Sequence, residues 1–346
     1  MRTLTKGLAS AVAVALMLTG CQSSTTGTTP GASGSTGKKS VVNVVNGPLG
    51  DAGFFDDAER GIKKLGESGH KVQTVQSEAN NPTSWKQNTE SVSGKWDIVV
   101  VGSSQMKEVL EGVAPKFPNQ KYVIYDDVVK ANNVASITFK QNEGSYLAGV
   151  LAALATTNKD KFPKASGSKV VGLVGGMDIP IINDFVVGFK KGVESVDPTI
   201  QVKTGFVGNF TDADKGYSIA KSMYEQDKAD VVYQVAGGAG LGVLKAAKDA
   251  GRYAIGVDSN QNKIQPGNVL ASMLKNVGEG VVTAVTAADE GKLEFGKTTS
   301  YGLKNNGVSL TFDDNGGIVP DDIKAKIKDY GQQVADGKIT VPTTMS

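Results

Sequence analysis

Residues 41–48 read Val41-Val42-Asn43-Val44-Val45-Asn46-Gly47-Pro48, a β-branched apolar run that ends in polar and small residues. Similar runs recur along the chain and alternate with amphipathic segments of helical length. This alternation is typical of a parallel β-sheet covered by helices on both faces. The first series predicts strands at 41–45, 71–75, 98–101, 122–125 and 134–137, with helices at 55–68, 84–93 and 106–117.

A second series of the same kind follows the first. It predicts strands at 170–174, 200–206, 231–235, 253–257 and 269–273, with helices at 143–155, 184–195, 212–226 and 240–250. Each series has the size of a single domain, so the sequence predicts an α/β protein with two doubly wound lobes that face one another.

The residues that follow the predicted strands are small or polar. Open parallel sheets bind ligands at the carboxyl ends of their strands, so a ligand cleft is expected there. These stretches are Asn46-Gly47-Pro48, Gly102-Ser103-Ser104, Asp126-Asp127, Gly175-Gly176-Met177, Ala236-Gly237-Gly238 and Asp258-Ser259-Asn260.

The N-terminus has the layout of a secretory signal. Residues 1–6 are positively charged, and the apolar run at 8–18 is shorter than the ~20 residues that a spanning helix requires. The run ends in Leu18-Thr19-Gly20-Cys21, which resembles the bacterial lipobox and implies cleavage after residue 20 and lipidation of Cys21. An ordinary signal peptide with a cysteine near its end by chance is the alternative. The Ser-, Thr- and Gly-rich residues 21–39 predict a flexible tether.

The sequence disfavours catalysis and nucleic-acid binding. It has one histidine and one cysteine, so neither a multi-histidine metal site nor a disulfide within the chain is expected, and no cofactor is predicted. His70 lies in the hydrophilic stretch 67–71, which predicts a solvated turn. With 37 basic and 35 acidic residues and no basic patch interleaved with aromatics, nucleic acid is excluded as a partner.

Two stretches beside predicted strands favour ligand binding. Gly237-Gly238-Ala239-Gly240-Leu241-Gly242 lacks the G-x-G-x-x-G spacing, so it predicts hydrogen bonds from the backbone to a ligand rather than pyrophosphate binding. Asp51-Ala52-Gly53-Phe54-Phe55-Asp56-Asp57 places two aromatic residues after the first strand. One of them is expected in the core, and the other could stack on a planar ring.

A carboxylate and an ammonium group end two predicted strands of the second series. Asp258 follows Ile255-Gly256-Val257, and Lys275 follows Met273-Leu274. If the two strands run in the same direction, both side chains reach the cleft, where a carboxylate and an ammonium suit the hydroxyls of a sugar. A structural salt bridge between the two side chains is the alternative.

A set of short stretches, in order over nearly the whole mature chain, resembles the basic membrane protein family of bacterial substrate-binding lipoproteins. The best-understood members of that family are purine nucleoside receptors that serve ABC importers. The stretches are Asp51-Ala52-Gly53-Phe54, Asn142-Glu143-Gly144-Ser145-Tyr146-Leu147-Ala148-Gly149, Gly172-Leu173-Val174-Gly175-Gly176, Phe185-Val186-Val187-Gly188-Phe189, Val235-Ala236-Gly237-Gly238, Gly256-Val257-Asp258-Ser259 and Leu274-Lys275.

The resemblance implies a type I periplasmic-binding-protein fold, with two lobes joined by a hinge. It implies an N-lobe at 40–138 plus about 276–299 and a C-lobe at 139–275 plus about 300–346. It also implies a lipid-anchored protein on the extracytoplasmic face of the cell membrane that captures a nucleoside, with purine favoured. The nucleoside would be delivered to the permease and ATPase subunits of an ABC importer, without enzymatic activity.

The resemblance also implies roles for individual residues. Phe54 matches the phenylalanine that stacks on the base, Asp126 the acidic residue that hydrogen-bonds the base, and Asp258 and Lys275 the residues that hold the ribose. Asn46 falls on the polar position after the first strand, and Gly237 on the glycine whose backbone approaches the nucleoside. Phe185 and Asp51 complete the expected ligand-binding set.

The chain departs from the family pattern at two positions. Phe55 stands where relatives carry Asn, and Val45 stands where many carry Asp just before Asn46. These departures bear on the identity of the base. A sugar or another planar heterocycle is the alternative ligand, and a sensor or adhesin lipoprotein is the alternative function.

Overall fold

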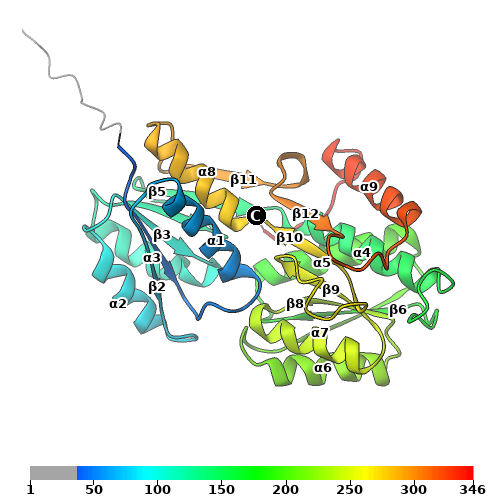
Figure 1. Ribbon diagram of the computed structural model, residues 1–346. Coiled ribbons are helices and arrows are strands. Elements are labelled where there is room, and N and C mark those ends of the chain that lie inside the picture. The colour runs from blue at the N-terminus through cyan, green and yellow to red at the C-terminus, as the bar shows by residue number, and fades with distance from the viewer. Residues whose placement is uncertain (1–36, 346) are drawn as a thin grey trace, which may run out of the picture. The chain divides into compact units, whose positions relative to one another are not determined.

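The structure is a computed structural model that describes residues 37–345 (Figure 1). The predicted signal, Cys21 and the tether up to residue 36 lie outside these residues. Between residues 37 and 345, no helix is long and apolar enough to cross a membrane.

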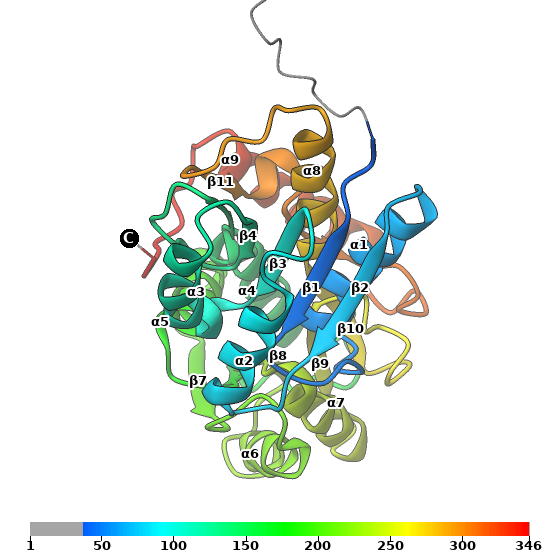
Figure 2. The same cartoon turned by 90° about the vertical axis from the view of Figure 1, so that its left-hand side faces the viewer.

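The N-lobe is built on a six-stranded, wholly parallel sheet with the order β11-β5-β4-β3-β1-β2. Side chains alternate between its two faces: Val100 packs with α1 and α8, while Val99 and Val101 pack with α2 and α3. Figure 2 shows α1 and α2 on opposite sides of β1 and β2. The elements are β1 (Val41–Val45), α1 (Phe54–Glu67), β2 (Val72–Gln76), α2 (Pro82–Val92), β3 (Ile98–Gly102), α3 (Lys107–Val113), β4 (Lys121–Tyr125), β5 (Val134–Phe139), α8 (Val277–Asp289) and β11 (Thr298–Tyr301).

The C-lobe is built on a second six-stranded sheet, with the order β12-β10-β9-β8-β6-β7. Its strands are parallel except for β12, which pairs antiparallel with β10. Helices α4 and α5 cover one face, and α6 and α7 cover the other. The elements are α4 (Gln141–Thr157), β6 (Val170–Gly175), α5 (Pro180–Val196), β7 (Gln201–Phe206), α6 (Ala213–Glu225), β8 (Val231–Val235), α7 (Gly240–Asp249), β9 (Tyr253–Asp258), β10 (Val269–Lys275), β12 (Val308–Thr311) and α9 (Asp321–Ala335).

Glycines set the distance between α4 and α5. A Cβ atom on Gly149 would lie 2.1 Å from the carbonyl oxygen of Phe189, and one on Gly192 would lie 2.0 Å from that of Tyr146. No side chain fits at such distances, so these positions let the two helix backbones touch. Helix α5 thereby presents its first turns at the ligand cavity described below.

The chain passes between the lobes after β5, after β10 and after β11. The predicted α/β fold with two doubly wound lobes is confirmed. The exact limits of the lobes stay a prediction. Sequence reasoning missed α8, α9, β11 and β12, and it merged residues 106–117 into one helix, whereas Pro115 lies in a separate 3₁₀ turn (Ala114–Lys116).

The prediction for His70 was wrong. Its side chain is 1% exposed, with Nδ1 2.9 Å from the carbonyl oxygen of Leu65 and Nε2 2.8 Å from a carboxylate oxygen of Asp289. The ring is thus held between a backbone carbonyl and a carboxylate and is not solvated. The hydrophilic neighbours of His70 in the sequence indicated a solvated turn. They could not reveal its burial, because the partner Asp289 comes from a helix 219 residues further along the chain.

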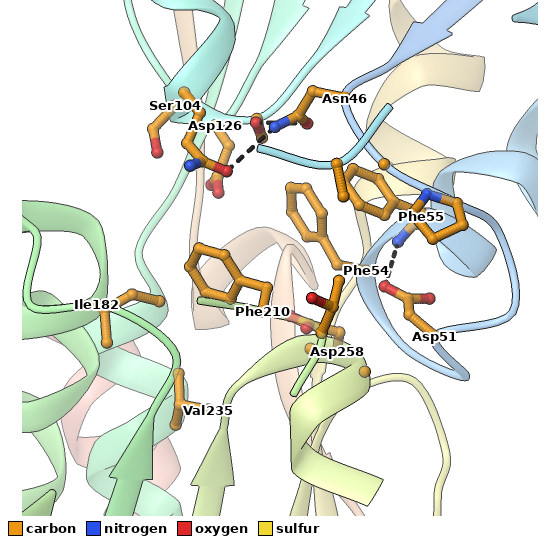
Figure 3. A pocket seen from close by; sticks show the side chains of 18 of the residues that line it. Asn46, Asp51, Phe54, Phe55, Ser104, Asp126, Ile182, Phe210, Val235 and Asp258 are labelled. Atoms are coloured by element: carbon orange, nitrogen blue, oxygen red, sulfur yellow. Dashed lines mark hydrogen bonds between the residues drawn. The ribbon is translucent and has the colours of Figure 1, made fainter. Parts of the chain in front are cut away.

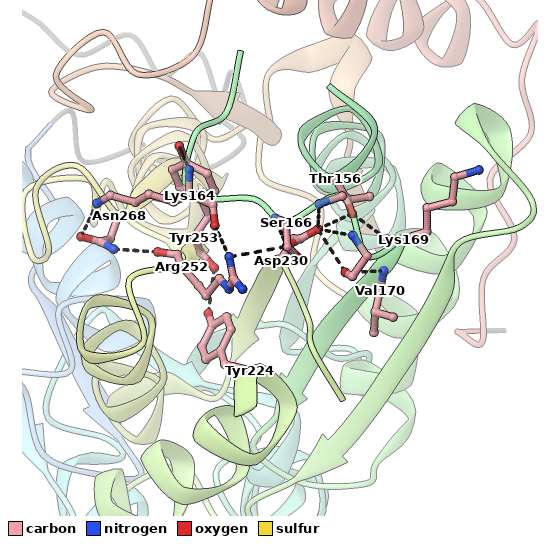
Figure 4. Close-up of polar contacts among 12 residues, drawn as sticks. Thr156, Lys164, Ser166, Lys169, Val170, Tyr224, Asp230, Arg252, Tyr253 and Asn268 are labelled. Carbon is pink, nitrogen blue, oxygen red and sulfur yellow. Dashed lines mark hydrogen bonds and ion pairs between the residues drawn. The ribbon is translucent and has the colours of Figure 1, made fainter. Parts of the chain in front are cut away.

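Asp230 organises the edge of the C-lobe opposite the strand ends that carry the ligand cavity (Figure 4). Its carboxylate is buried and accepts hydrogen bonds from the hydroxyl of Thr156 and from the backbone N–H groups of Ser166, Gly167 and Ser168. Burial alone would raise the pKa of Asp230, but the hydrogen bonds from Thr156 and Ser166 hold it below its ordinary value. The carboxylate therefore fixes the loop between α4 and β6.

We expect Asp230→Asn to lower the free energy of unfolding by about 2–3 kcal/mol, because an amide N–H group would face backbone donors. The wild-type contribution is present above the unfolded pKa of ~3.9 and is lost as the pH falls through the lower native pKa, so the loss should be largest near neutral pH. Urea denaturation measures it. The exposed Asp160→Asn in the same region should change little, and an equal effect of both variants would contradict this role.

Candidate functional site

A cavity of about 370 Å³ lies between the lobes (Figure 3). Its volume is within the range of ~300–1,000 Å³ that is usual for small-molecule sites. Residues at the carboxyl ends of strands from both sheets line it. These residues are Asn46, Ser103, Asp126, Val235, Asp258 and Lys275.

The backbone is unusual at several of these strand ends. Ser103, Asp126 and Asp258 have φ angles of +79°, +77° and +64°, in the left-handed region that residues other than glycine seldom occupy. Such conformations persist only where the surrounding structure holds them, and they cluster at ligand sites. The strained strand ends therefore mark the cavity independently of its shape.

Two aromatic side chains from opposite lobes lie across the cavity from one another. Phe54 is the first residue of α1, and its ring centroid lies 5.6 Å from that of Tyr125. Phe210 comes from the loop after β7, and Figure 3 shows its ring on the C-lobe side of the cavity, facing Phe54 of the N-lobe. A Cβ atom on Gly176 would lie 2.3 Å from the Phe210 ring, so glycine is required there. Sequence reasoning missed Phe210, although an aromatic residue in the polar stretch Asn209-Phe210-Thr211 resembles the setting of Phe54.

Phe55, one of the two departures from the family pattern, also lines the cavity. Its ring packs over the backbone of Gly47, where a Cβ atom would lie 2.9 Å away, and its centroid is 5.5 Å from that of Phe54 in a T-shaped pair. Neither phenylalanine is fully buried; Phe54 packs against the core and lines the cavity at the same time. Phe55 thus adds apolar surface at the cavity wall.

Asp51 holds the loop that carries Phe54. Its carboxylate accepts hydrogen bonds from the backbone N–H groups of Gly53, Phe55 and Asp56 at 3.0–3.1 Å. Burial raises the pKa of Asp51, and these hydrogen bonds oppose the rise. Asp51 lines the cavity, but its carboxylate oxygens are hydrogen-bonded to the backbone at the start of α1.

Lys275, the last residue of β10, is 1% exposed and pairs with Asp126 of the N-lobe. Its Nζ lies 5.4, 5.7 and 5.3 Å from the ring centroids of Phe54, Phe139 and Phe185, distances suited to cation–π attraction. Asp258 and Lys275 both reach the cavity, as expected, but the direct ion pair of Lys275 is with Asp126. The lysine thus joins the two lobes.

Asp258 is the last residue of β9 and is buried. Burial raises its pKa to about 8, against the attraction of Lys275 and with the repulsion of Asp51 and Asp126. A protonated carboxyl group donates one hydrogen bond and accepts others, so at neutral pH Asp258 can offer both to a ligand.

Polar side chains continue along the N-lobe edge of the cavity. The Oδ1 of Asn46 accepts from the hydroxyl of Ser103 at 2.9 Å, and its Nδ2 donates to Oε1 of Gln105 at 3.0 Å. Sequence reasoning missed Gln105, which lies in the short 3₁₀ turn after β3. The stretch after β6, Gly175-Gly176-Met177, does not line the cavity; Ile181 and Ile182 of α5 do so instead.

All eight residues of the expected ligand-binding set line this cavity. They are Asn46, Asp51, Phe54, Asp126, Phe185, Gly237, Asp258 and Lys275. Gly237 has a φ of +55°, which favours glycine at the turn after β8. Their individual roles towards a ligand stay predictions. Among residues 37–345, no group of three or more His, Cys, Asp or Glu side chains could hold a metal ion.

Two α/β lobes with a ligand cavity between their strand ends define a binding protein of the periplasmic type. Residues 38–344 match the family of PnrA-like ABC transporter substrate-binding proteins, and the chain belongs to this family. It is therefore a substrate-binding protein of the extracytoplasmic class rather than an enzyme.

Relatives agree with this assignment over most of the chain. The ABC transporter nucleoside-binding protein BmpA of Lactococcus lactis subsp. cremoris is 34% identical over 96% of this chain and 97% of its own length. The CD4+ T-cell-stimulating antigen of Listeria monocytogenes is 34% identical over 86% and 85%. An ABC transporter solute-binding protein from Aeropyrum pernix K1 has a similar crystal structure, with a TM-score of 0.79 and 27% identity over 88% of this chain and 93% of that one.

The raised pKa of Asp258 predicts that the ligand-free protein loses stability as the pH rises. The carboxyl group titrates near ~3.9 in an unfolded chain, so between that pH and pH 8 the native state binds more protons than the unfolded state. The free energy of unfolding should fall across this window by on the order of a few kcal/mol.

We expect Asp258→Asn to flatten this slope, as measured by urea denaturation at about pH 5 and about pH 8. The matched exposed variant Asp313→Asn should retain it. A slope unchanged by Asp258→Asn would show that this carboxyl group is ionised throughout.

Proposed function

We propose that this protein is a lipid-anchored, extracytoplasmic receptor that captures a nucleoside, with purine favoured, and delivers it to an ABC importer. The observation that carries the proposal is a single cavity with aromatic rings from opposite lobes and a charged end at Asp126, Lys275 and Asp258. A nucleoside has the same two parts, a flat apolar base and a polar sugar.

The base would lie between Phe54 and Phe210. Stacking of a base on an aromatic side chain contributes about 1–3 kcal/mol and tolerates different bases, because each base has a flat π-face. The amides of Gln105 and Asn46 lie one and two strands along the sheet from Asp126 and would meet the polar edge of the base. Asp126 pairs with Lys275. It would also hydrogen-bond the base, which is the role that the family resemblance implies for it.

The ribose would lie at the charged end of the cavity. Lys275 donates hydrogen bonds, and Asp258 can donate and accept, so together they match hydroxyl groups that do both. The turn at Gly237 would bring backbone N–H groups to the same ligand from the C-lobe. The name of the Lactococcus lactis relative, a nucleoside-binding protein, supports this choice over a sugar.

Lipid anchoring is proposed on the sequence alone. Cys21 would carry the lipid, and the tether would leave the lobes free to meet a permease at the membrane surface. A lipid anchor would keep the binding protein at the membrane surface, close to the permease that receives the ligand.

Inosine binding, measured by isothermal titration calorimetry, tests the proposal. Phe54→Ala and Phe210→Ala should each weaken binding by about 10- to 100-fold, because each removes one stacking face. Phe295→Ala, a half-buried phenylalanine outside the cavity, is the matched control and should bind as the wild type does. Thermal unfolding of each variant checks that it is folded. A wild type that binds no nucleoside, or cavity variants that bind like the control, would refute the proposal.

A further inference from the structure

A pair of buried glutamines in the C-lobe is hydrogen-bonded to the turn that carries Gly237. Gln234 on β8 and Gln261 after β9 are 0% and 1% exposed. The Nε2 of Gln234 donates to Oε1 of Gln261 at 2.6 Å, and Oε1 of Gln234 accepts from the backbone N–H of Ala236 at 3.1 Å. A Cβ atom on Gly240 would lie 1.8 Å from Oε1 of Gln234, so the fold keeps a glycine there to seat this amide.

Gln261 also reaches across to the N-lobe. Its Nε2 donates to the carbonyl oxygen of Ala52 at 3.1 Å, and the hydroxyl of Ser259 donates to that of Gly53 at 2.9 Å. Ala52 and Gly53 directly precede Phe54, and Ala52 has a φ of +49°, a conformation that alanine adopts only when contacts hold it. The loop that carries Phe54 is therefore docked on the opposite lobe.

The two ends of the Gln261 amide serve different lobes. Its oxygen is satisfied within the C-lobe by Gln234 and by the backbone N–H of Val257 at 3.0 Å, and its N–H group is used by the N-lobe loop. Gln261, through its hydrogen bond to Gln234, thus links the loop that carries Phe54 to the turn that carries Gly237, and these two segments face the cavity from opposite lobes.

We propose that Gln261 is a positioning residue that sets Phe54 against the Gly237 turn, so that the two sides of the ligand site are assembled together. This inference rests on the proposed function, because its consequence is measured as ligand affinity. If the lobes separate at this point, the hydrogen bond from Gln261 to the carbonyl oxygen of Ala52 breaks. This hydrogen bond and a ligand that touches both lobes therefore both favour the arrangement in which the lobes are together.

Gln261→Glu tests this positioning role, because it replaces only the side-chain amide nitrogen by an oxygen. An ionised carboxylate still accepts from Gln234 and Val257 but has no proton for the carbonyl oxygen of Ala52. A protonated carboxyl group regains that donor, and burial raises the pKa of such a group. Relative to the wild type at the same pH, affinity for inosine should fall about 10-fold near pH 8 and recover near pH 5. Referring each value to the wild type removes the contributions that the titration of Asp258 and the charges of Asp51 and Arg60 already make to affinity in the wild type.

Two controls separate positioning from general damage. Gln226→Glu, on the exposed end of α6, should bind like the wild type at both pH values. In a Phe54→Ala background, Gln261→Glu should cause little further loss, because the ring that it positions is gone. A loss that is equal at both pH values, or one that persists in full without Phe54, would overturn the proposal.

Hydrogen exchange in the ligand-free protein distinguishes failure of this inference from failure of the proposed function. Near pH 8, Gln261→Glu should speed exchange of the amides of Gly53, Phe55 and Asp56, which are bound to Asp51. If the wild type binds no nucleoside, the proposed function fails whatever the exchange shows. Unchanged exchange at these amides would overturn the docking of the loop by Gln261.

Discussion

The site depends on a buried ammonium group. A charge removed from water requires a partner and further favourable contacts, and removing its partner leaves an uncompensated charge that costs several kcal/mol, on the order of 3–5. Lys275 finds Asp126 on the opposite lobe and is surrounded by the rings of Phe54, Phe139 and Phe185. The constraint therefore acts on both lobes at once: the strand ends must meet at this point, and the aromatic residues around it must lie close to the charge.

The same constraint explains why the cavity has two chemically different parts. Burial at the charged end also raises the pKa of Asp258, so that one carboxyl group can donate as well as accept. Phe54 borders this end, with its ring centroid 5.4 Å from Nζ of Lys275, and together with Phe55 and Phe210 it supplies apolar faces, while Asn46 and Gln105 supply neutral amides. Because each part draws on both lobes, a ligand that fills the cavity stabilises the arrangement in which the lobes are together.

The sequence predicted the strands and the residues at their ends because both follow from local patterns. Asn46, Asp126 and Asp258 follow or end apolar runs, and parallel sheets place such residues at one edge. Features that depend on distant partners escaped it: the burial of His70 against Asp289, the pairing of Lys275 with Asp126, and the position of Phe210 against Gly176. Strands β11 and β12 were missed because four residues, several of them polar, carry too little periodicity.

The most direct test of the central claim is calorimetric titration of the wild type with inosine, hypoxanthine and ribose in parallel. If the aromatic and charged ends of the cavity hold the two halves of one ligand, inosine should bind at least ~100-fold more tightly than either fragment, because a joined ligand loses its overall freedom only once. Ribose that binds as tightly as inosine would contradict the account and would indicate a sugar receptor instead.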